Sequence, residues 1–167
     1  MLLLVRAARP HVAFLGRIPG TNSYSDFARH PENEPLPRAI AFRPEVSLLY
    51  VNADAVVEAV LDHLRRVAPS DIRLVICDLS ASPTLDLAGS RMLHDLHSEL
   101  AGRGIALRII GARGSVRDLL RADGMAEKVG GLDRVATLDS LLNADDRRTA
   151  TPPGSSMKGL SHGSEAQ

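Results

Sequence analysis

The spacing of hydrophobic positions changes repeatedly along the chain, between short apolar runs and helical spacing. The apolar runs predict β-strands over residues 12–15, 39–42, 46–51, 72–77, 105–110 and 134–136. Apolar residues three and four positions apart predict α-helices over residues 53–67, 86–101, 115–122 and 138–143. Because strands that alternate with helices make parallel crossover connections, the chain is predicted to form an α/β fold with helices covering a sheet.

The predicted strands differ in how they are placed. Residues 72–77 form the most continuous apolar run between two aspartates, which predicts a central strand buried on both faces. Residues 39–42 and 46–51 flank the turn at 43–45 and predict a hairpin. Residues 16–38 are rich in Pro, Gly, Asn and Ser and predict a long connection, of a length that is usually functional or ordered by docking on a partner.

Polar residues at the predicted helix starts supply N-caps. Asn52, Asp86 and Thr137 each precede a helical pattern, and their side-chain oxygens can accept a free backbone N–H. Ser115 with Asp118 three residues later resembles a capping box.

The two ends of the chain differ from its centre. An apolar stub at residues 1–5 is followed by Arg6 and Arg9, and it is too short to span a membrane. Two interpretations stay open: the end of a membrane helix with its arginines on the cytoplasmic side, or a short strand or disordered leader. The hydrophobic pattern stops near Asp145. The predicted division is a junction or leader at 1–11, one domain at 12–144 and a disordered tail at 145–167.

Composition narrows the function classes. The chain has 167 residues, 44% of them hydrophobic, which suits one domain with a real core. Its 20 basic and 20 acidic residues argue against a nucleic-acid partner, because phosphate binding depends on an excess of Lys and Arg. The single cysteine, Cys77, excludes an internal disulfide, fits a reducing compartment such as the cytosol, and is predicted to be an inert core residue.

The common enzyme motifs are absent from the sequence, and one pair of histidines is the nearest to a catalytic feature. His94 and His97 lie three apart with Asp95 between them, a spacing that could bring two imidazoles together for metal or proton chemistry. The favoured interpretation is a polar helix face, because Leu93 and Leu96 mark the buried one. We predict no metal site and no cofactor.

Two loops follow predicted strands and open helices. Gly111, Arg113, Gly114 and Ser115 could bind an anion at the positive end of a helix, although a plain strand-to-helix turn uses the same residue types. The other loop follows the predicted central strand, at the sheet edge where α/β proteins bind ligands and partners. Asp86 and Gly89 are predicted to act there in capping and close packing. The candidate partner-binding residues are Ser80, Ser82, Thr84, Asp86, Leu87, Ala88, Gly89 and Ser90.

This second loop carries a family resemblance. Val75-Ile-Cys-Asp-Leu-Ser80, followed by Leu85-Asp-Leu-Ala-Gly89, resembles the centre of a STAS domain, a module shared by sulfate permease-type (SulP) anion transporters and bacterial anti-sigma-factor antagonists. Residues 9–21, 30–35 and 40–45 look like the stretch that joins the last membrane helix of a bacterial sulfate permease-type transporter to its STAS domain. The resemblance covers about residues 4–143 and implies a STAS-type fold, a mixed, mostly parallel sheet covered by about four α-helices.

One departure from the family pattern affects the expected mechanism. In the antagonists this helix begins Asp-Ser-Ser-Gly, and a kinase phosphorylates the first serine. Leu87 and Ala88 replace both serines here, so phosphorylation cannot occur at that site. Ser82, Thr84 and Ser90 are the nearby hydroxyls.

The resemblance implies a cytoplasmic, non-catalytic regulatory domain of a sulfate or related anion transporter. The implied partners are the membrane domain of the same transporter, a second STAS copy or a cytosolic protein, with a nucleotide or anion at 111–115. The alternatives are a free-standing STAS protein that binds a transcription regulator and a small enzyme using the two histidines.

Overall fold

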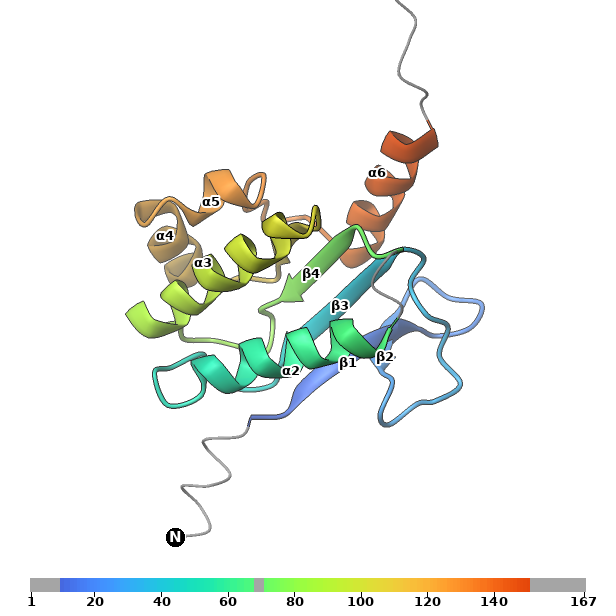
Figure 1. Cartoon of the computed structure of the whole chain (residues 1–167), viewed down its shortest axis with the longest axis horizontal. Coiled ribbons are helices and arrows are strands. Elements are labelled where there is room, and N and C mark those ends of the chain that lie inside the picture. Colours follow the sequence, from blue (N-terminus) through green and yellow to red (C-terminus); the bar gives the residue numbers. More distant parts are fainter. Residues whose placement is uncertain (1–9, 68–70, 151–167) are drawn as a thin grey trace, which may run out of the picture.

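A computed structural model describes residues 10–67 and 71–150. A five-stranded sheet runs through it in the order β2-β1-β3-β4-β5. Figure 1 shows β1 to β4 of this sheet beside the helices. The strands are β1 (Val12–Arg17), β2 (Tyr24–Asp26), β3 (Ala39–Pro44), β4 (Leu74–Asp78) and β5 (Ala106–Ile110). The five helices of these residues are α2 (Ala53–Arg66), α3 (Leu87–Gly102), α4 (Gly114–Ala122), α5 (Met125–Lys128) and α6 (Leu138–Ala150).

The sheet is mixed, and its central part is parallel. β4 pairs in parallel with β3 on one side and with β5 on the other, through α2 and α3 as crossover helices. β1 is antiparallel to both β3 and β2. The predicted α/β fold with a mostly parallel sheet is confirmed.

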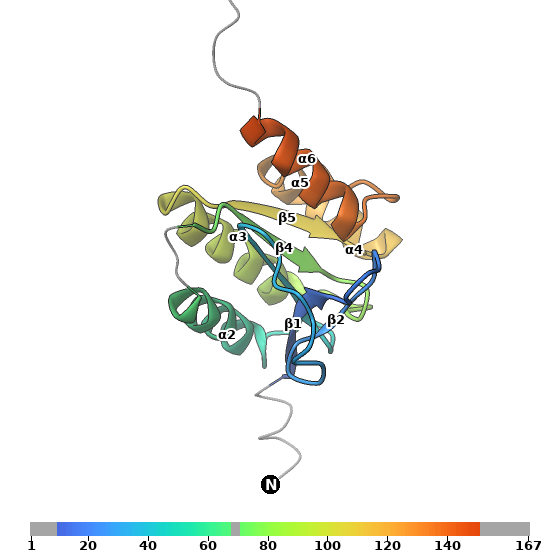
Figure 2. The ribbon, with the colours of Figure 1, turned by 90° about the vertical axis from the view of Figure 1, so that its right-hand side faces the viewer.

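Alternation along the strands divides the core into two layers. Val75 and Cys77 of β4 face the larger cluster, which α2, α3, α4 and α5 cover, whereas Leu74 and Ile76 face the smaller cluster, to which α6 contributes Leu138. Figure 2 shows α2 and α3 on one side of the sheet and α6 on the other. β4 is therefore buried on both faces, as its continuous apolar run predicts.

The predicted strand at 46–51 and its hairpin are wrong. Leu48 forms a single parallel bridge with Leu85, and the chain then turns before α2. Asn52 explains the turn, because its Oδ1 accepts a hydrogen bond from Leu49 N–H at 3.0 Å while its Nδ2 donates to the Ser47 carbonyl at 2.9 Å. The amide is used in this turn and makes no side-chain cap on α2, so the predicted cap is also wrong.

Other element predictions need correction. Residues 134–136 form no strand, because the N–H of Val135 donates to Asp133 Oδ1 at 3.0 Å in a local bend and not to a neighbouring strand. The side chain of Val135 is 79% exposed. The predicted connection at 16–38 contains β2, which lies at the sheet edge and is only three residues long. The short helix α5 has no predicted counterpart.

Helix ends follow the capping chemistry only in part. The hydroxyl oxygen of Thr137 accepts a hydrogen bond from the N–H of Ser140 at 3.2 Å, which confirms its predicted cap. α4 begins at Gly114 without a side-chain cap, so the predicted capping box at Ser115 is wrong.

α6 continues to Ala150, which corrects the predicted disorder at 145–150. Residues 1–9 and 151–167 lie outside the described part of the chain, and the domain division stays a prediction. None of the described helices is long and apolar enough to cross a membrane.

Candidate partner-binding site

One carboxylate ties the start of α3 to the turn before α2. Asp86 is the N-cap of α3, and its Oδ1 accepts a 2.8 Å hydrogen bond from the backbone N–H of Gly89. Its Oδ2 accepts a 3.0 Å hydrogen bond from the backbone N–H of Tyr50. The Gly89 N–H contributes most to lowering the pKa of Asp86 below its ordinary value, because these donors favour the ionised form and outweigh partial desolvation. The predicted cap at Asp86 is confirmed.

The backbone reinforces this link. Leu48 N–H donates to the Thr84 carbonyl at 3.1 Å, and Asp86 N–H donates to the Leu48 carbonyl at 3.2 Å. Gly89 lies against the same carbonyl, and a Cβ there would lie 2.5 Å from the Leu48 oxygen. Only glycine fits this contact without displacement of backbone, so the predicted close packing at Gly89 is confirmed.

The hydroxyls of the loop divide into buried and exposed groups. Ser82 is 1% exposed, and its Oγ lies 2.8 Å from the Val46 carbonyl oxygen, to which it can donate. Ser90 is also 1% exposed and donates to the carboxylate of Asp123. Ser80 and Thr84 are exposed. The two buried serines hold the loop in place, and the two exposed hydroxyls are the ones accessible to a modifying enzyme or a partner.

Exposed apolar side chains lie beside this capped turn. Tyr50 is 78% exposed, Leu87 59% and Val51 40%, and we call these three residues the exposed apolar patch. Since Tyr50 N–H and the N-terminus of α3 meet at Asp86, the patch joins two segments that are far apart in the sequence. Exposed apolar side chains that gather on one surface are typical of a protein-binding site, whereas isolated ones are not.

The predicted anion loop lies next to the candidate site. Gly111 has a positive φ of 70°, and a Cβ there would lie 2.5 Å from Asp78 Oδ1. Arg113, Gly114 and Ser115 are exposed. The Asp78 carboxylate opposes an anion at Gly111 itself, so Arg113 and the first N–H groups of α4 are the available anion donors. Anion or nucleotide binding here stays a prediction.

The first histidine of the predicted pair contacts two charged side chains from the α4–α5 region. His94 Nε2 lies 3.5 Å from Asp123 Oδ2, and its Nδ1 lies 3.1 Å from Lys128 Nζ. Both His94 and His97 are partly buried, so they do not lie on a fully solvated face. Within residues 10–67 and 71–150, no group of three His, Cys, Asp or Glu side chains could hold a metal ion.

Burial raises the pKa of the Cys77 thiol well above its ordinary value, which disfavours a nucleophilic thiolate.

Comparison with known proteins identifies the domain. The family model described as STAS domain matches residues 30–140, well over half of the chain. The chain belongs to the STAS domain family. The resemblance seen in the sequence is confirmed.

The relatives of this STAS domain include sulfate transporters. Low affinity sulfate transporter 3 of Stylosanthes hamata is 31% identical over 137 residues, which cover 77% of this chain and 21% of the transporter. The murine solute carrier 26 family member A9 anion transporter, in its inward-facing state, matches with a TM-score of 0.72 and 15% identity, over 87% of this chain and 24% of its own. A putative anti-sigma factor antagonist from Thermotoga maritima matches with a TM-score of 0.55 and 14% identity, over 64% of this chain and 86% of its own. The two structural matches show the fold alone, and the chain spans about a fifth of the curated relative's length.

The site of this STAS domain contains residues that the sequence did not indicate. Leu48 and Tyr50 contribute the carbonyl and the N–H that meet α3, but their placement in a predicted strand hid them. Asn52 was the available signal, because Asn favours turns in which its side chain bonds to nearby backbone. An assignment of Asn52 to a turn would have taken Tyr50 out of the predicted strand.

Proposed function

We propose that this STAS domain belongs to a sulfate permease-type anion transporter and regulates transport through protein contacts, without catalysis of its own. It lies on the cytoplasmic side of the membrane in this proposal, and its first partner is the membrane domain of the same transporter. The transporter relatives support this, since the chain corresponds to about a fifth of such a protein. The exposed apolar patch supplies the contact.

The observation that carries the proposal is the exposure of Tyr50 and Leu87 on a turn held by Asp86. Single exposed apolar side chains need no explanation, but Tyr50 and Leu87, 78% and 59% exposed, lie on two segments that meet at Asp86, and this gathering supports a protein contact. The absence of a hydroxyl at positions 87 and 88 supports a contact that phosphorylation does not switch there.

The test uses the transporter that carries this domain, reconstituted in vesicles. Leu87→Glu and Tyr50→Glu each place a charge in the exposed apolar patch, and we expect both to reduce the maximal rate of anion uptake. The KM for the anion stays unchanged, because the transported ion binds in the membrane domain. We expect both variants to fold, since both side chains are exposed.

Val135→Glu is the matched control, because Val135 is an equally exposed apolar residue in the loop before α6. Its transport rate should equal that of the unchanged protein. Equal rates for the Leu87→Glu, Tyr50→Glu and Val135→Glu proteins would exclude the patch from regulation. A gene product without any membrane segment would favour the free-standing STAS alternative.

A further inference from the structure

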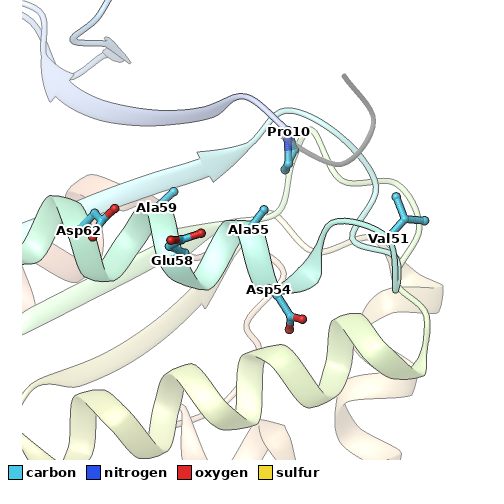
Figure 3. Close-up of a pocket in the computed structure, with 7 residues that line it drawn as sticks. All are labelled: Pro10, Val51, Asp54, Ala55, Glu58, Ala59 and Asp62. Atoms are coloured by element: carbon cyan, nitrogen blue, oxygen red, sulfur yellow. The ribbon is translucent and has the colours of Figure 1, made fainter. Parts of the chain in front are cut away.

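Hollows on two sides of α2 differ in their chemistry. The hollow on the outer face of the helix is open and is lined by Asp54, Glu58 and Asp62 (Figure 3), and water is enough to solvate such carboxylates. The other is a cavity of about 320 Å³ between the sheet and the C-terminal end of α2. β1, β3 and the connection from β2 to β3 supply most of its other walls. We call it the apolar cavity.

The walls of the apolar cavity are fixed by contacts within the domain. The rings of Phe14 and His63 stack with their centroids 3.7 Å apart. Phe27 is held beside Phe14, because its N–H donates to the Phe14 carbonyl at 2.9 Å. Its ring packs on Gly16, where a Cβ would lie 2.5 Å from the ring carbons. The cavity is therefore preformed, as sites for small molecules commonly are.

The lining of the apolar cavity selects an apolar occupant. Every lining residue except His63 is apolar. Water makes few hydrogen bonds in such a space, whereas apolar molecules enter it readily. The cavity of about 320 Å³ holds roughly ten groups of about 30 Å³, which is the share of one water molecule in the liquid, and a methylene group is of similar size. An alkyl chain of about ten carbons therefore fits.

A polar end of the site lies in a second, more open hollow, which shares Phe14, Phe27 and His63 with the apolar cavity. Arg66 lines this outer hollow. Its Nε donates to the Asp62 carbonyl at 3.2 Å, and no carboxylate in residues 10–67 and 71–150 pairs with it. The outer hollow therefore places an uncompensated positive charge beside an apolar cavity.

Two other titratable side chains line the outer hollow. His63 is half-buried, and within the described part of the chain nothing bonds to its ring nitrogens. Burial, followed by the charge of Arg66, lowers the pKa of His63, so its neutral ring offers one N–H donor. Asp26 is 5% exposed, and its carboxylate accepts the N–H of Ala28 and contacts His11 Nε2, at 2.9 Å each. An anionic group therefore finds available donors at His63 and Arg66.

We propose that this site binds a free fatty acid of about ten carbons, with its alkyl chain in the apolar cavity and its carboxylate against Arg66 and His63. Burial of the chain supplies most of the affinity, at about fourfold for each methylene group. The two donors fix the direction in which the chain enters. This inference goes beyond the proposed transporter function and does not rest on it.

Calorimetric titration of the full-length chain with sodium decanoate tests the cavity. We expect saturable binding of one molecule per chain, and octanoate, which has two methylene groups fewer, should bind about fifteenfold more weakly. Val67→Phe narrows the cavity and should weaken decanoate binding about tenfold, as for the exclusion of about two methylene groups. The matched control is Val57→Phe, because Val57 is also half-buried against the larger core cluster but does not line the cavity. It should leave the affinity unchanged.

The carboxylate position has its own test. Arg66→Gln should weaken decanoate binding about fivefold, as for the loss of one partly exposed ion pair, and should leave the binding of uncharged decanol unchanged. Arg65→Gln is the control, since Arg65 is exposed, pairs with Asp62 and lines neither hollow. Because Arg66 is exposed, its variant gives an answer even if the Val67→Phe protein were to unfold.

Proton NMR gives a readout that does not depend on affinity. Bound decanoate should raise the pKa of His63, because a nearby carboxylate favours the charged ring. A pKa of His63 that stays the same in the saturated protein would overturn the placement of the carboxylate.

Three outcomes would overturn the proposal as a whole. One is an affinity that does not change with chain length, and another is an equal loss of affinity in the Val67→Phe and Val57→Phe proteins. The third is the absence of decanoate binding in a protein that binds vesicles of anionic phospholipid and loses this binding with Val67→Phe. That result would assign the apolar cavity to a membrane lipid.

Discussion

Gly89 shows how one residue fixes the geometry of the site. It lies in the first turn of α3, packs against the Leu48 carbonyl and donates its N–H to Asp86, which in turn binds Tyr50. A hydrogen atom in place of a side chain allows this approach. The lowered pKa of Asp86 means that the link is fully formed above the carboxyl's unfolded pKa and weakens as the pH falls through the lower folded value.

Gly89→Ala should destabilise the domain. The added Cβ would lie 2.5 Å from the Leu48 carbonyl oxygen, a backbone atom that cannot move alone, so we expect a loss of about 1–3 kcal/mol in the free energy of unfolding. Urea denaturation measures it. The control is Gly102→Ala in the same helix, where a Cβ meets nothing within 4 Å and the better helix propensity should maintain or raise stability. Equal effects of the two substitutions would contradict the packing argument.

At the scale of elements, the carboxylate of Asp123 links α3 to the turn between α4 and α5, beside the contact of His94 with Lys128. Asp123 accepts a hydrogen bond from the Ser90 hydroxyl, and its Oδ2 lies 3.5 Å from His94 Nε2. Its Oδ1 accepts a hydrogen bond from the backbone N–H of Met125 at 3.0 Å. Ser90 and His94 are four residues apart, so they lie on one face of α3. The contacts of His94 are therefore structural ones that join α3 to the α4–α5 turn.

Asp123→Ala should therefore cost about 2 kcal/mol in the free energy of unfolding, because it leaves the buried Ser90 hydroxyl without its acceptor. Thermal or urea unfolding followed by circular dichroism gives the value. Asp118→Ala is the comparison on α4, where the carboxylate is 77% exposed and pairs only with Arg121 at its own surface, and its effect should stay within about 0.5 kcal/mol. Similar losses for the two variants would show that Asp123 does not join the elements.

At the scale of the whole molecule, α6 covers the second face of the sheet (Figure 2). Contacts with the core and with an edge strand from the N-terminal part of the chain hold it there. Leu138 is buried in the smaller core cluster. The hydroxyl of Tyr24, on edge strand β2, donates to Asp139 Oδ1 at 3.2 Å across 115 residues of sequence. Burial, followed by this carboxylate, raises the pKa of Tyr24 above its ordinary value.

Tyr24→Phe should loosen α6 without unfolding the sheet. Loss of one hydrogen bond, worth about 1 kcal/mol, should speed amide hydrogen exchange in α6 about fivefold. The protein has a second tyrosine, Tyr50, whose side chain is 78% exposed, so Tyr50→Phe should leave exchange in α6 unchanged. Unchanged exchange in the Tyr24→Phe protein would mean that α6 is held by its apolar contacts alone.

The sequence predicted the features that depend on local periodicity and local chemistry. These features are the apolar run of β4, the apolar stripes of α2 and α3, and the caps at Asp86 and Thr137. Each depends on residues a few positions apart, so the pattern of one sequence is enough to predict it. The family resemblance added the STAS fold. Asn52 misled the prediction, because its turn competes with strand formation and a cap, and composition alone does not decide between them.

Only the tertiary structure decided which distant segments form the site. The bond from Tyr50 to Asp86, the contact of Leu48 with Gly89, and the burial of Ser82 and Ser90 join positions that no periodic pattern relates. The sequence by itself determined that the chain forms a neutral α/β domain with a buried central strand, since burial periodicity is a local property. The exposure of Tyr50 and Leu87 depends on how the segments pack, because a side chain is exposed only where no other element covers it.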